Sequence, residues 1–176
     1  MRQLAEAVGL SQAGLLHYFD SKEELFTSVL RKRDEVQSRA FTREQEPAGI
    51  DEFLALVRDN ADVPGLVRLY VNVSAAASDP DHAGHDYFRA RTAHIRSLFV
   101  PVLTEVKQRG RLPDDLDPQR LARILVAITD GLQVQWLMDP SIDMAADIAA
   151  VLHALGIDAS ADRAAALDAA EPALEA

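Results

Sequence analysis

The chain has 176 residues, of which 48% are hydrophobic and 26% are charged, as in an ordinary globular protein. It contains no cysteine, so disulfides and thiolate metal sites are excluded and a cytoplasmic location is expected. No apolar run approaches the roughly 20 residues of a membrane-spanning helix, so no membrane partner is expected. Residues 1–46 carry 7 basic and 8 acidic side chains, whereas residues 47–176 carry 11 and 20. The net charge of −10 therefore lies mostly in the second part, and the first part remains compatible with DNA.

The hydrophobic residues recur with a helical period throughout, which predicts an all-α fold. Ser11 precedes a short helix that ends at about Tyr18, and the capping box Ser21–Glu24 opens a long helix from Lys22 to about Gln45. Further helices are predicted, in chain order, over Asp51–Ala61, over Pro64–Ser78, from His82 to before Gly110, over Pro118–Met138, and from Asp143 to Leu155. Residues 158–176, which are half alanine, are predicted to form a disordered tail.

Residues 3–19 have the spacing of two short helices joined by a tight turn, as in a helix-turn-helix. Gly9 suits the left-handed backbone that such a turn needs. Ser11 and Lys22 stand at helix N-termini, which favour phosphate oxygens. Four residues of the second helix are expected to point outward, where they could meet base edges in a major groove: Gln12, Ala13, Leu16 and His17. Five apolar residues are spaced to form the shared core: Leu4, Val8, Leu10, Leu15 and Phe19. The alternative is a generic three-helix packing unit that contacts no DNA.

The residues Leu4-Ala5, Gly9-Leu10-Ser11, Leu15 and Tyr18–Phe26 together resemble the DNA-binding signature of the TetR family of repressors. The resemblance implies that Ser11, Tyr18 and Lys22 contact phosphates, and that Gln12, Ala13 and His17 lie at base-reading positions. Leu16 departs from the pattern, because the family usually has a phosphate-binding tyrosine there. The function implied is a ligand-responsive transcriptional regulator, a repressor that a small molecule releases from its double-stranded DNA operator.

The sequence begins at what resembles the second helix of that family, without the basic arm and first helix that precede it in other members. We therefore expect the native chain to start upstream of Met1, since Leu4, Val8 and Leu15 would otherwise lose apolar burial worth about 25 cal/mol per Å². Residues 1–45 are then an incomplete DNA-binding domain with its connecting helix, and residues 46–157 are an effector-binding and dimerisation domain. The alternative function is a truncated ligand-binding and dimerisation protein that does not bind DNA by itself.

The segment 118–138 is apolar on two sides, and the last predicted helix carries one apolar stripe. Two such helices from each of two subunits would form a four-helix bundle across a twofold axis, as in TetR-like proteins. The homodimer interface is predicted to contain eight residues of these helices: Leu121, Leu125, Ile128, Leu132, Ile148, Val151, Leu152 and Leu155. The alternative is that these residues form a core within one chain.

Polar groups among apolar neighbours in the middle of the chain are typical of a small-molecule pocket. Because TetR-like proteins bind effectors in this domain, the resemblance implies an effector pocket, but the residues do not reveal which effector it takes. The candidate lining residues are Phe53, Tyr70, Asn72, Phe88, Arg91, His94, Ile95, Asp130, Gln133 and Trp136. Taken singly, each of them also fits a core or surface position.

The loop Asp79–Asp86 contains two histidines three residues apart with nearby carboxylates, a spacing that can bind a divalent metal. We favour the simpler interpretation, acidic groups at a helix N-terminus, and expect neither a metal nor a cofactor. A small helical enzyme is not expected either, because the sequence has no catalytic triad, buried carboxylate pair, P-loop or dinucleotide motif.

Overall fold

The computed structural model describes residues 5–6, 9–41 and 50–157, apart from the side chains of residues 16 and 38–41. Within these ranges the chain forms seven α-helices and no strand, which confirms the predicted all-α fold. The helices are α2 (Gln12–Leu16), α3 (Lys22–Phe41), α4 (Ile50–Ala61), α5 (Pro64–Ala76), α6 (His85–Gln108), α7 (Pro118–Met138) and α8 (Met144–Ala154). None of the helices in the described part of the chain has the length and apolar character needed to cross a membrane.

Side-chain caps at the predicted positions begin the helices α2, α7 and α8. The Ser11 hydroxyl accepts from the Gly14 amide at 2.9 Å, and the Asp143 carboxylate accepts from the Ala146 amide at 2.9 Å. The Asp117 carboxylate accepts from two amides at the start of α7. Because each cap joins residues within three positions of one another, the sequence pattern alone was sufficient to locate these helix starts.

Three helix ends differ from the prediction by two or three residues. The helices α2 and α5 end at Leu16 and Ala76, each two residues earlier than expected, and α6 begins at His85 instead of His82. The chain before α6 turns twice, with amide-to-carbonyl bonds from His82 to Asp79 and from His85 to His82, so the helical pattern starts only afterwards. The predicted helix end at Gln45 and the predicted tail over residues 158–176 lie outside the described residues.

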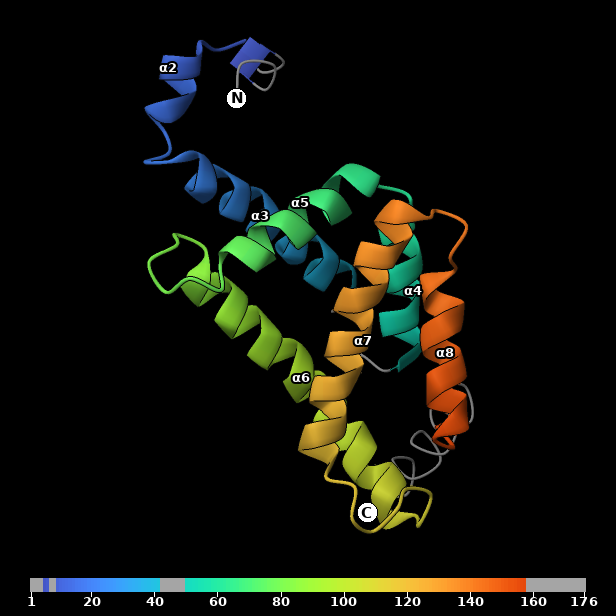
Figure 1. Cartoon of the computed structure of the whole chain (residues 1–176). Coiled ribbons are helices and arrows are strands. Elements are labelled where there is room, and N and C mark those ends of the chain that lie inside the picture. The colour runs from blue at the N-terminus through green and yellow to red at the C-terminus, as the bar shows by residue number, and fades with distance from the viewer. Residues whose placement is uncertain (1–4, 7–8, 42–49, 158–176) are drawn as a thin grey trace, which may run out of the picture.

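The seven helices are arranged so that α2 lies at one end, and α3 runs from it into a larger helical body (Figure 1). Within that body α7 contacts α5, α6 and α8, and α4 contacts both α5 and α8. The largest hydrophobic core lies among α4, α6, α7 and α8, and it includes residues such as Leu103 and Ile148 that are at most 1% exposed. The burial of these apolar residues is the main stabilising term of the fold.

A second, smaller core attaches α3 to this body. Leu30 of α3 is 1% exposed and packs with Tyr70, Val73 and Phe88 of α5 and α6. The helix that begins beside the helix-turn-helix is therefore fixed to the helical body by buried side chains. A displacement of α5 or α6 is expected to be transmitted to α3 through this contact.

Candidate functional site

The turn of the helix-turn-helix has the predicted geometry. Gly9 adopts a positive φ of 69°, and the Leu10 amide closes the turn by donating to the Ala5 carbonyl at 2.9 Å. Leu15 packs in a small core with Ala5, Leu25, Phe19 and Phe26. Leu10 was predicted to belong to this core, but it lies in the turn itself and is 39% exposed. The predicted core residues Leu4 and Val8 lie outside the described residues.

The candidate DNA-contacting residues lie on the accessible surface of this unit. Ser11, Gln12, Ala13, His17, Tyr18 and Lys22 are all exposed, and the Tyr18 side chain is 70% exposed. The Leu16 side chain is not among those the structure describes. Exposure leaves these residues accessible to phosphates or base edges, and their contacts with DNA stay a prediction.

The start of α3 is held by the predicted capping box. The Ser21 hydroxyl accepts from the Glu24 amide at 3.0 Å, and the Glu24 carboxylate accepts from the Asp20 amide at 2.6 Å. The carboxylate therefore reaches one residue further back than the usual box, in which it accepts from the cap residue itself. Both bonds fix the backbone beside Lys22, the residue expected to meet a phosphate.

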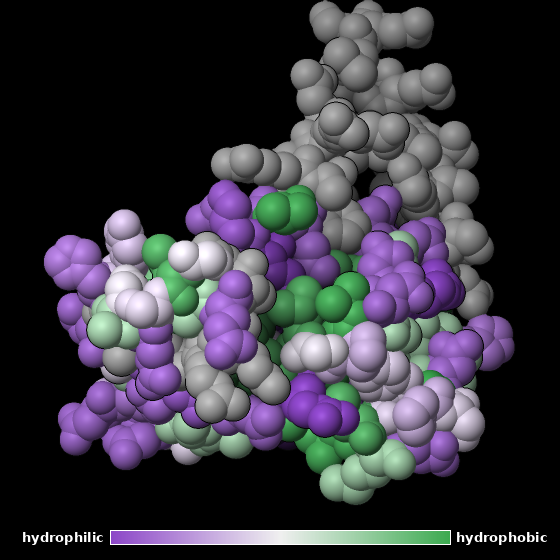
Figure 2. Space-filling model, turned by 90° about the horizontal axis from the view of Figure 1, so that it is seen from above, coloured by the Kyte–Doolittle hydropathy of each residue, from purple (hydrophilic) through white to green (hydrophobic). Residues whose placement is uncertain are grey.

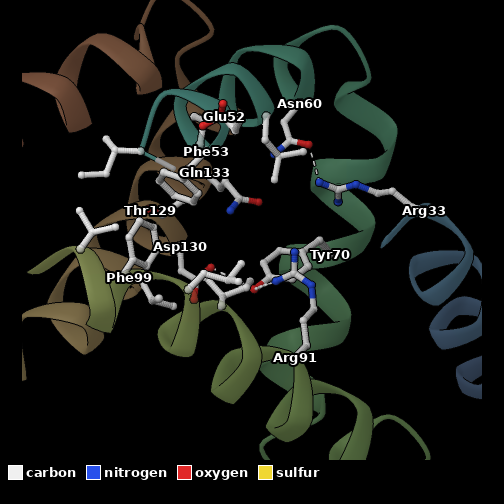
Figure 3. Close-up of a pocket in the computed structure, with 17 residues that line it drawn as sticks. Arg33, Glu52, Phe53, Asn60, Tyr70, Arg91, Phe99, Thr129, Asp130 and Gln133 are labelled. Atoms are coloured by element: carbon white, nitrogen blue, oxygen red, sulfur yellow. Dashed lines mark hydrogen bonds between the residues drawn. The ribbon is translucent and has the colours of Figure 1, made fainter. Parts of the chain in front are cut away.

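The helical body contains a cavity of about 110 Å³ between α3, α4, α5, α6 and α7. Polar side chains from different helices meet in it, and Figure 3 shows them facing a common space. The polar lining residues are Arg33, Glu52, Asn60, Tyr70, Arg91, Thr129, Asp130 and Gln133. The rest of the wall is apolar and consists of Ile50, Phe53, Leu56, Val57, Ile95, Leu98, Phe99, Val102 and Val126.

A chain of hydrogen bonds crosses the polar side of this cavity and ends on α3. The Tyr70 hydroxyl donates to Asp130 at 3.0 Å and accepts from Arg91 Nη1 at 3.2 Å. Arg91 Nε donates to Asp34 Oδ2 at 2.8 Å, and the Tyr87 hydroxyl donates to the same oxygen at 2.5 Å. The carboxylates of Asp34 and Asp130 are thus joined to each other through Arg91 and Tyr70.

Burial controls the ionisation of this network. It raises the pKa of Asp130, although the Tyr70 hydroxyl and Arg91 both favour the charged carboxylate. Burial also raises the pKa of Tyr70 and of Tyr87, so both phenols stay neutral. Burial by itself would lower the pKa of Arg91, but Tyr70 and Asp34 outweigh that effect and raise the pKa. Arg91 is therefore held as a cation between neutral phenols and an aspartate.

Arg33 and Gln133 have fewer hydrogen-bond and ion-pair partners than the residues of this network. The Arg33 guanidinium donates to the Asn60 side-chain oxygen, and no ion pair joins it to a carboxylate of the described residues. Burial lowers the pKa of Arg33, and repulsion from Arg91 lowers it further. The Gln133 side chain is 7% exposed and forms no hydrogen bond with any described residue. Both groups line the cavity.

Six of the ten residues predicted to line an effector pocket are brought together in this cavity. They are Phe53, Tyr70, Arg91, Ile95, Asp130 and Gln133. Asn72 and His94 do not line it, because they lie on exposed helix faces. Phe88 is buried on the other side of Tyr70, with ring centroids 5.5 Å apart, and Trp136 is buried in the main core beside a separate depression.

The prediction missed Arg33 of α3, which lines the cavity, and its neighbour Asp34, which bonds to Arg91 of the cavity wall, because a helix rich in charged residues resembles a solvent-exposed helix. A signal was available in the helical period. Phe26, Leu30 and Arg33 are spaced four and three residues apart, so they share one face of α3, and Leu30 on that face is buried. A charged residue that continues a buried helical face is a candidate for a polar internal site.

The predicted dimer residues divide between the core and the surface. Leu121, Leu125, Ile148 and Leu152 are at most 3% exposed within a single chain, so they belong to its internal core. Ile128, Leu132, Val151 and Leu155 are partly buried against that core. For the first four residues this burial favours the alternative, a core within one chain. A helix that is apolar on both sides does not show in its sequence which side faces its own chain.

A different stripe of α7 is exposed instead. It repeats every three or four residues and consists of Ile124, Ala127, Gly131, Val134 and Met138. Ile124, Val134 and Met138 are 43%, 37% and 80% exposed, which is unusual for large apolar residues along one helix face. Figure 2, which views the molecule from above, shows hydrophobic surface among the hydrophilic residues of the helical body.

The histidines of the loop before α6 are engaged in local bonds. His82 Nδ1 accepts from the Gly84 amide at 3.0 Å, and His85 Nδ1 lies 2.9 Å from the Ala77 carbonyl oxygen. Among the residues that the structure describes, no group of three or more histidine or acidic side chains could hold a metal ion.

Two family models match the chain. The model described as bacterial regulatory proteins of the tetR family matches residues 1–29. The model described as the C-terminal part of BetI-type transcriptional repressors matches residues 48–158, which is more than half of the chain. The chain belongs to the TetR family. Its two matched regions correspond to the helix-turn-helix with the start of α3, and to the helical body with the cavity.

This TetR-family chain is similar to the HTH-type transcriptional repressor Rv1474c of Mycobacterium tuberculosis. The two are 26% identical over 137 residues, which represent 75% of this chain and 68% of that protein. No solved structure matches the chain significantly. The TetR-family chain is a DNA-binding transcriptional regulator, as its helix-turn-helix predicted, and its family implies a regulatory role instead of an enzymatic one.

Proposed function

We propose that this TetR-family chain is a homodimeric repressor that leaves its double-stranded operator when a small molecule occupies the cavity of the helical body. One observation carries the proposal. Helix α3 begins at Lys22, beside the surface expected to contact DNA, and three turns later it carries Arg33 into the cavity wall. A single rigid element therefore connects the two sites.

Bonds from α3 to the cavity wall support this connection. Arg33 donates to Asn60 of α4, and the next residue, Asp34, accepts from Arg91 and Tyr87 of α6. A ligand that displaces Arg33 or Arg91 acts on α3 directly. It shifts the equilibrium towards release only if it binds the DNA-free arrangement more tightly than the DNA-bound one.

For the operator we retain the assignment that the family resemblance implies. Ser11, Tyr18 and Lys22 contact phosphates, and Gln12, Ala13 and His17 lie towards the base edges. Leu16, which the helical spacing alone places on the outward side, lies beside them. The exposure of the residues whose side chains are described supports this assignment. Phosphate contacts supply affinity, and base contacts supply sequence preference.

We assign the dimer contact to the exposed stripe of α7, Ile124, Ala127, Gly131, Val134 and Met138, in place of the buried residues of the same helix. Ala127 and Gly131 allow close approach of a partner helix, and no atom lies within 4 Å of a Cβ built on Gly131. Helix α8, which contacts α7, exposes mainly small residues, among them Ala146, Ala150 and Ala154. These surfaces suit a four-helix bundle between two subunits.

The test uses operator fragments selected from genomic DNA and a metabolite library screened for release, with fluorescence anisotropy as the measurement. Val126 lines the cavity and is 8% exposed, so Val126→Phe is expected to fill it, to keep operator binding and to abolish release. Val126→Leu provides a smaller filling should the phenylalanine disturb folding. Gln119→Trp, at an exposed position of the same helix, is the matched control. Normal release from both folded cavity variants would exclude the cavity as the effector site.

A further inference from the structure

Gln133 is a buried amide whose hydrogen-bonding groups have no partner among the described residues. Its side chain is 7% exposed, and Figure 3 shows the amide in the middle of the cavity, between Phe53 and Asp130. Buried polar groups in native proteins are almost always hydrogen-bonded, since an unmade bond in the interior is costly. The position therefore points to a polar group of a ligand inside the cavity.

Arg33 lines the same cavity, and its guanidinium forms no ion pair with a carboxylate of the described residues. Its bond to Asn60 is to a neutral amide oxygen, and Asp34 beside it is bonded instead to Arg91 and Tyr87. Asp130 likewise already accepts from Tyr70. A partly buried guanidinium without a carboxylate partner favours an anion, and its planar fork matches a carboxylate particularly well.

The remaining wall is apolar and leaves little room. Phe53 and Phe99 meet edge to face, with centroids 4.8 Å apart and an interplanar angle of 83°. The cavity of about 110 Å³ is somewhat smaller than the cavity of roughly 150 Å³ that admits benzene in another protein. The apolar part of a ligand is therefore limited to a body no larger than one ring, such as a short branched chain.

From the unpartnered Gln133 amide, the unpaired Arg33 guanidinium and this apolar wall, we infer that the effector is a small organic acid, a carboxylate on a compact apolar body. The carboxylate pairs with Arg33, the Gln133 amide donates to one of its oxygens, and the body lies against Phe53 and Phe99. The inference rests on the proposed function, because it specifies the ligand of the same cavity.

Calorimetric titration of the full chain with two matched pairs of probes tests the inference. The pairs are 3-methylbutanoate with 3-methylbutanamide, and benzoate with benzamide, so that only the charge changes within a pair. At least one acid is expected to bind with a dissociation constant of about 1 mM or tighter, and about tenfold more tightly than its amide, because charge-assisted bonds are the stronger ones.

Three variants identify the residues responsible. Arg33→Gln is expected to remove the preference for the acid, and Arg33→Lys to keep most of it. Gln133→Leu is expected to weaken the binding of the acid and of the amide alike by about tenfold, because it removes a hydrogen bond but no charge. Arg89→Gln, at an exposed position of α6, is the control and should change neither affinity.

The inference is overturned if neither acid binds, if the amides bind as tightly as the acids, or if Arg33→Gln keeps the preference. The release assay separates this failure from that of the proposed function. If an uncharged compound releases the operator from the unaltered chain but not from Val126→Phe, the cavity is still the effector site, but the inference that the effector is an acid is wrong. If the acids bind as expected but never change operator affinity, the anion site stands and the effector role fails.

Discussion

Asp34 of α3 and Arg91 of α6 form an ion pair, with 2.8 Å between Oδ2 and Nε, although 57 residues separate them in the sequence. Their side chains are only 27% and 15% exposed, so water screens the pair less than it screens a surface pair. Tyr87 donates to the same oxygen of Asp34. Helix α3 is thereby tied to the helix that forms one wall of the cavity.

Asp34→Asn is expected to lower the free energy of unfolding by about 1–3 kcal/mol, because it leaves Arg91 without its anionic partner. It should also reduce the change in operator affinity that a cavity ligand produces. Urea denaturation and fluorescence anisotropy measure the two effects. The control is Glu35→Gln, which removes a surface ion pair with Lys32. The side chains of Lys32 and Glu35 are 65% and 48% exposed, so the free energy of unfolding should fall by at most about 1 kcal/mol. Equal losses for both variants would contradict a coupling role of Asp34.

Gly84→Ala is expected to disturb the contact between α3 and the start of α6. A Cβ on Gly84 would lie 2.9 Å from Thr27 Oγ1 and 3.2 Å from His82 Nδ1, and Thr27 is 2% exposed. Such overpacking costs typically about 1–3 kcal/mol. Thermal denaturation should show this loss, whereas Gly65→Ala, where nothing lies within 4 Å, should leave stability unchanged or slightly higher. An unaltered melting temperature for Gly84→Ala would show that the loop adapts freely.

Lys22→Gln is expected to weaken operator binding to a similar extent for all DNA sequences. Loss of one phosphate contact should reduce the slope of log affinity against log salt concentration by about 0.9. Gln12→Ala should instead alter sequence preference, by about 1–3 kcal/mol at one base pair. Lys32→Gln, further along the exposed side of α3, serves as the control. If Lys32→Gln changes the salt dependence as much as Lys22→Gln does, the assignment of Lys22 to a phosphate is wrong.

Ile124→Glu is expected to convert the dimer to a monomer in light scattering while the subunit stays folded, because it places a charge in the exposed stripe of α7. Arg123→Glu, the exposed neighbour, should leave the dimer intact. Leu121→Ala should act differently and destabilise the subunit by about 2–5 kcal/mol, because Leu121 is 3% exposed within one chain. A dimer that persists in Ile124→Glu would place the interface elsewhere.

Asp130→Asn is expected to stabilise the chain at neutral pH. Burial raises the pKa of Asp130 in the folded chain above its value in the unfolded chain, so the folded state binds this proton more tightly. Stability from this group is therefore complete below the unfolded pKa and is lost as the pH rises through the folded pKa. The asparagine side chain keeps an oxygen that accepts from the Tyr70 hydroxyl, but its contribution to stability does not depend on pH. Urea denaturation across a pH series should show that the stability difference between Asp130→Asn and the unaltered chain becomes smaller in acid. A variant less stable than the unaltered chain at neutral pH would contradict the prediction.

The elements predicted best are those whose cause is local. The cap bonds of Ser11 and Asp143 and the positive φ of Gly9 involve residues close together in the chain, and the structure has all three as expected. Six of the ten residues predicted to line an effector pocket also lie around one cavity, and their role in binding an effector stays a prediction. The division of the chain after residue 45 stays a prediction.

The faces of the helices could not be predicted in the same way. The sequence of α7 is apolar on both sides, so Leu121 and Ile124 were equally suited to a core or to a partner, and only packing against α6 and α8 separated them. The positions of Arg33 and Asp34 could not be predicted either, because charged residues on a helix predict a solvent-exposed face. Their partners Asn60 and Arg91 lie 27 and 57 residues away.

The sequence by itself determined the helices, their caps and the helix-turn-helix with its family, because these depend on backbone preferences and bonds within about one helical turn. The tertiary structure alone decided which residues share the cavity, which side of α7 remains exposed, and how α3 is joined to the cavity. These depend on contacts between distant segments, and side-chain periodicity shows that a face is buried without showing what buries it.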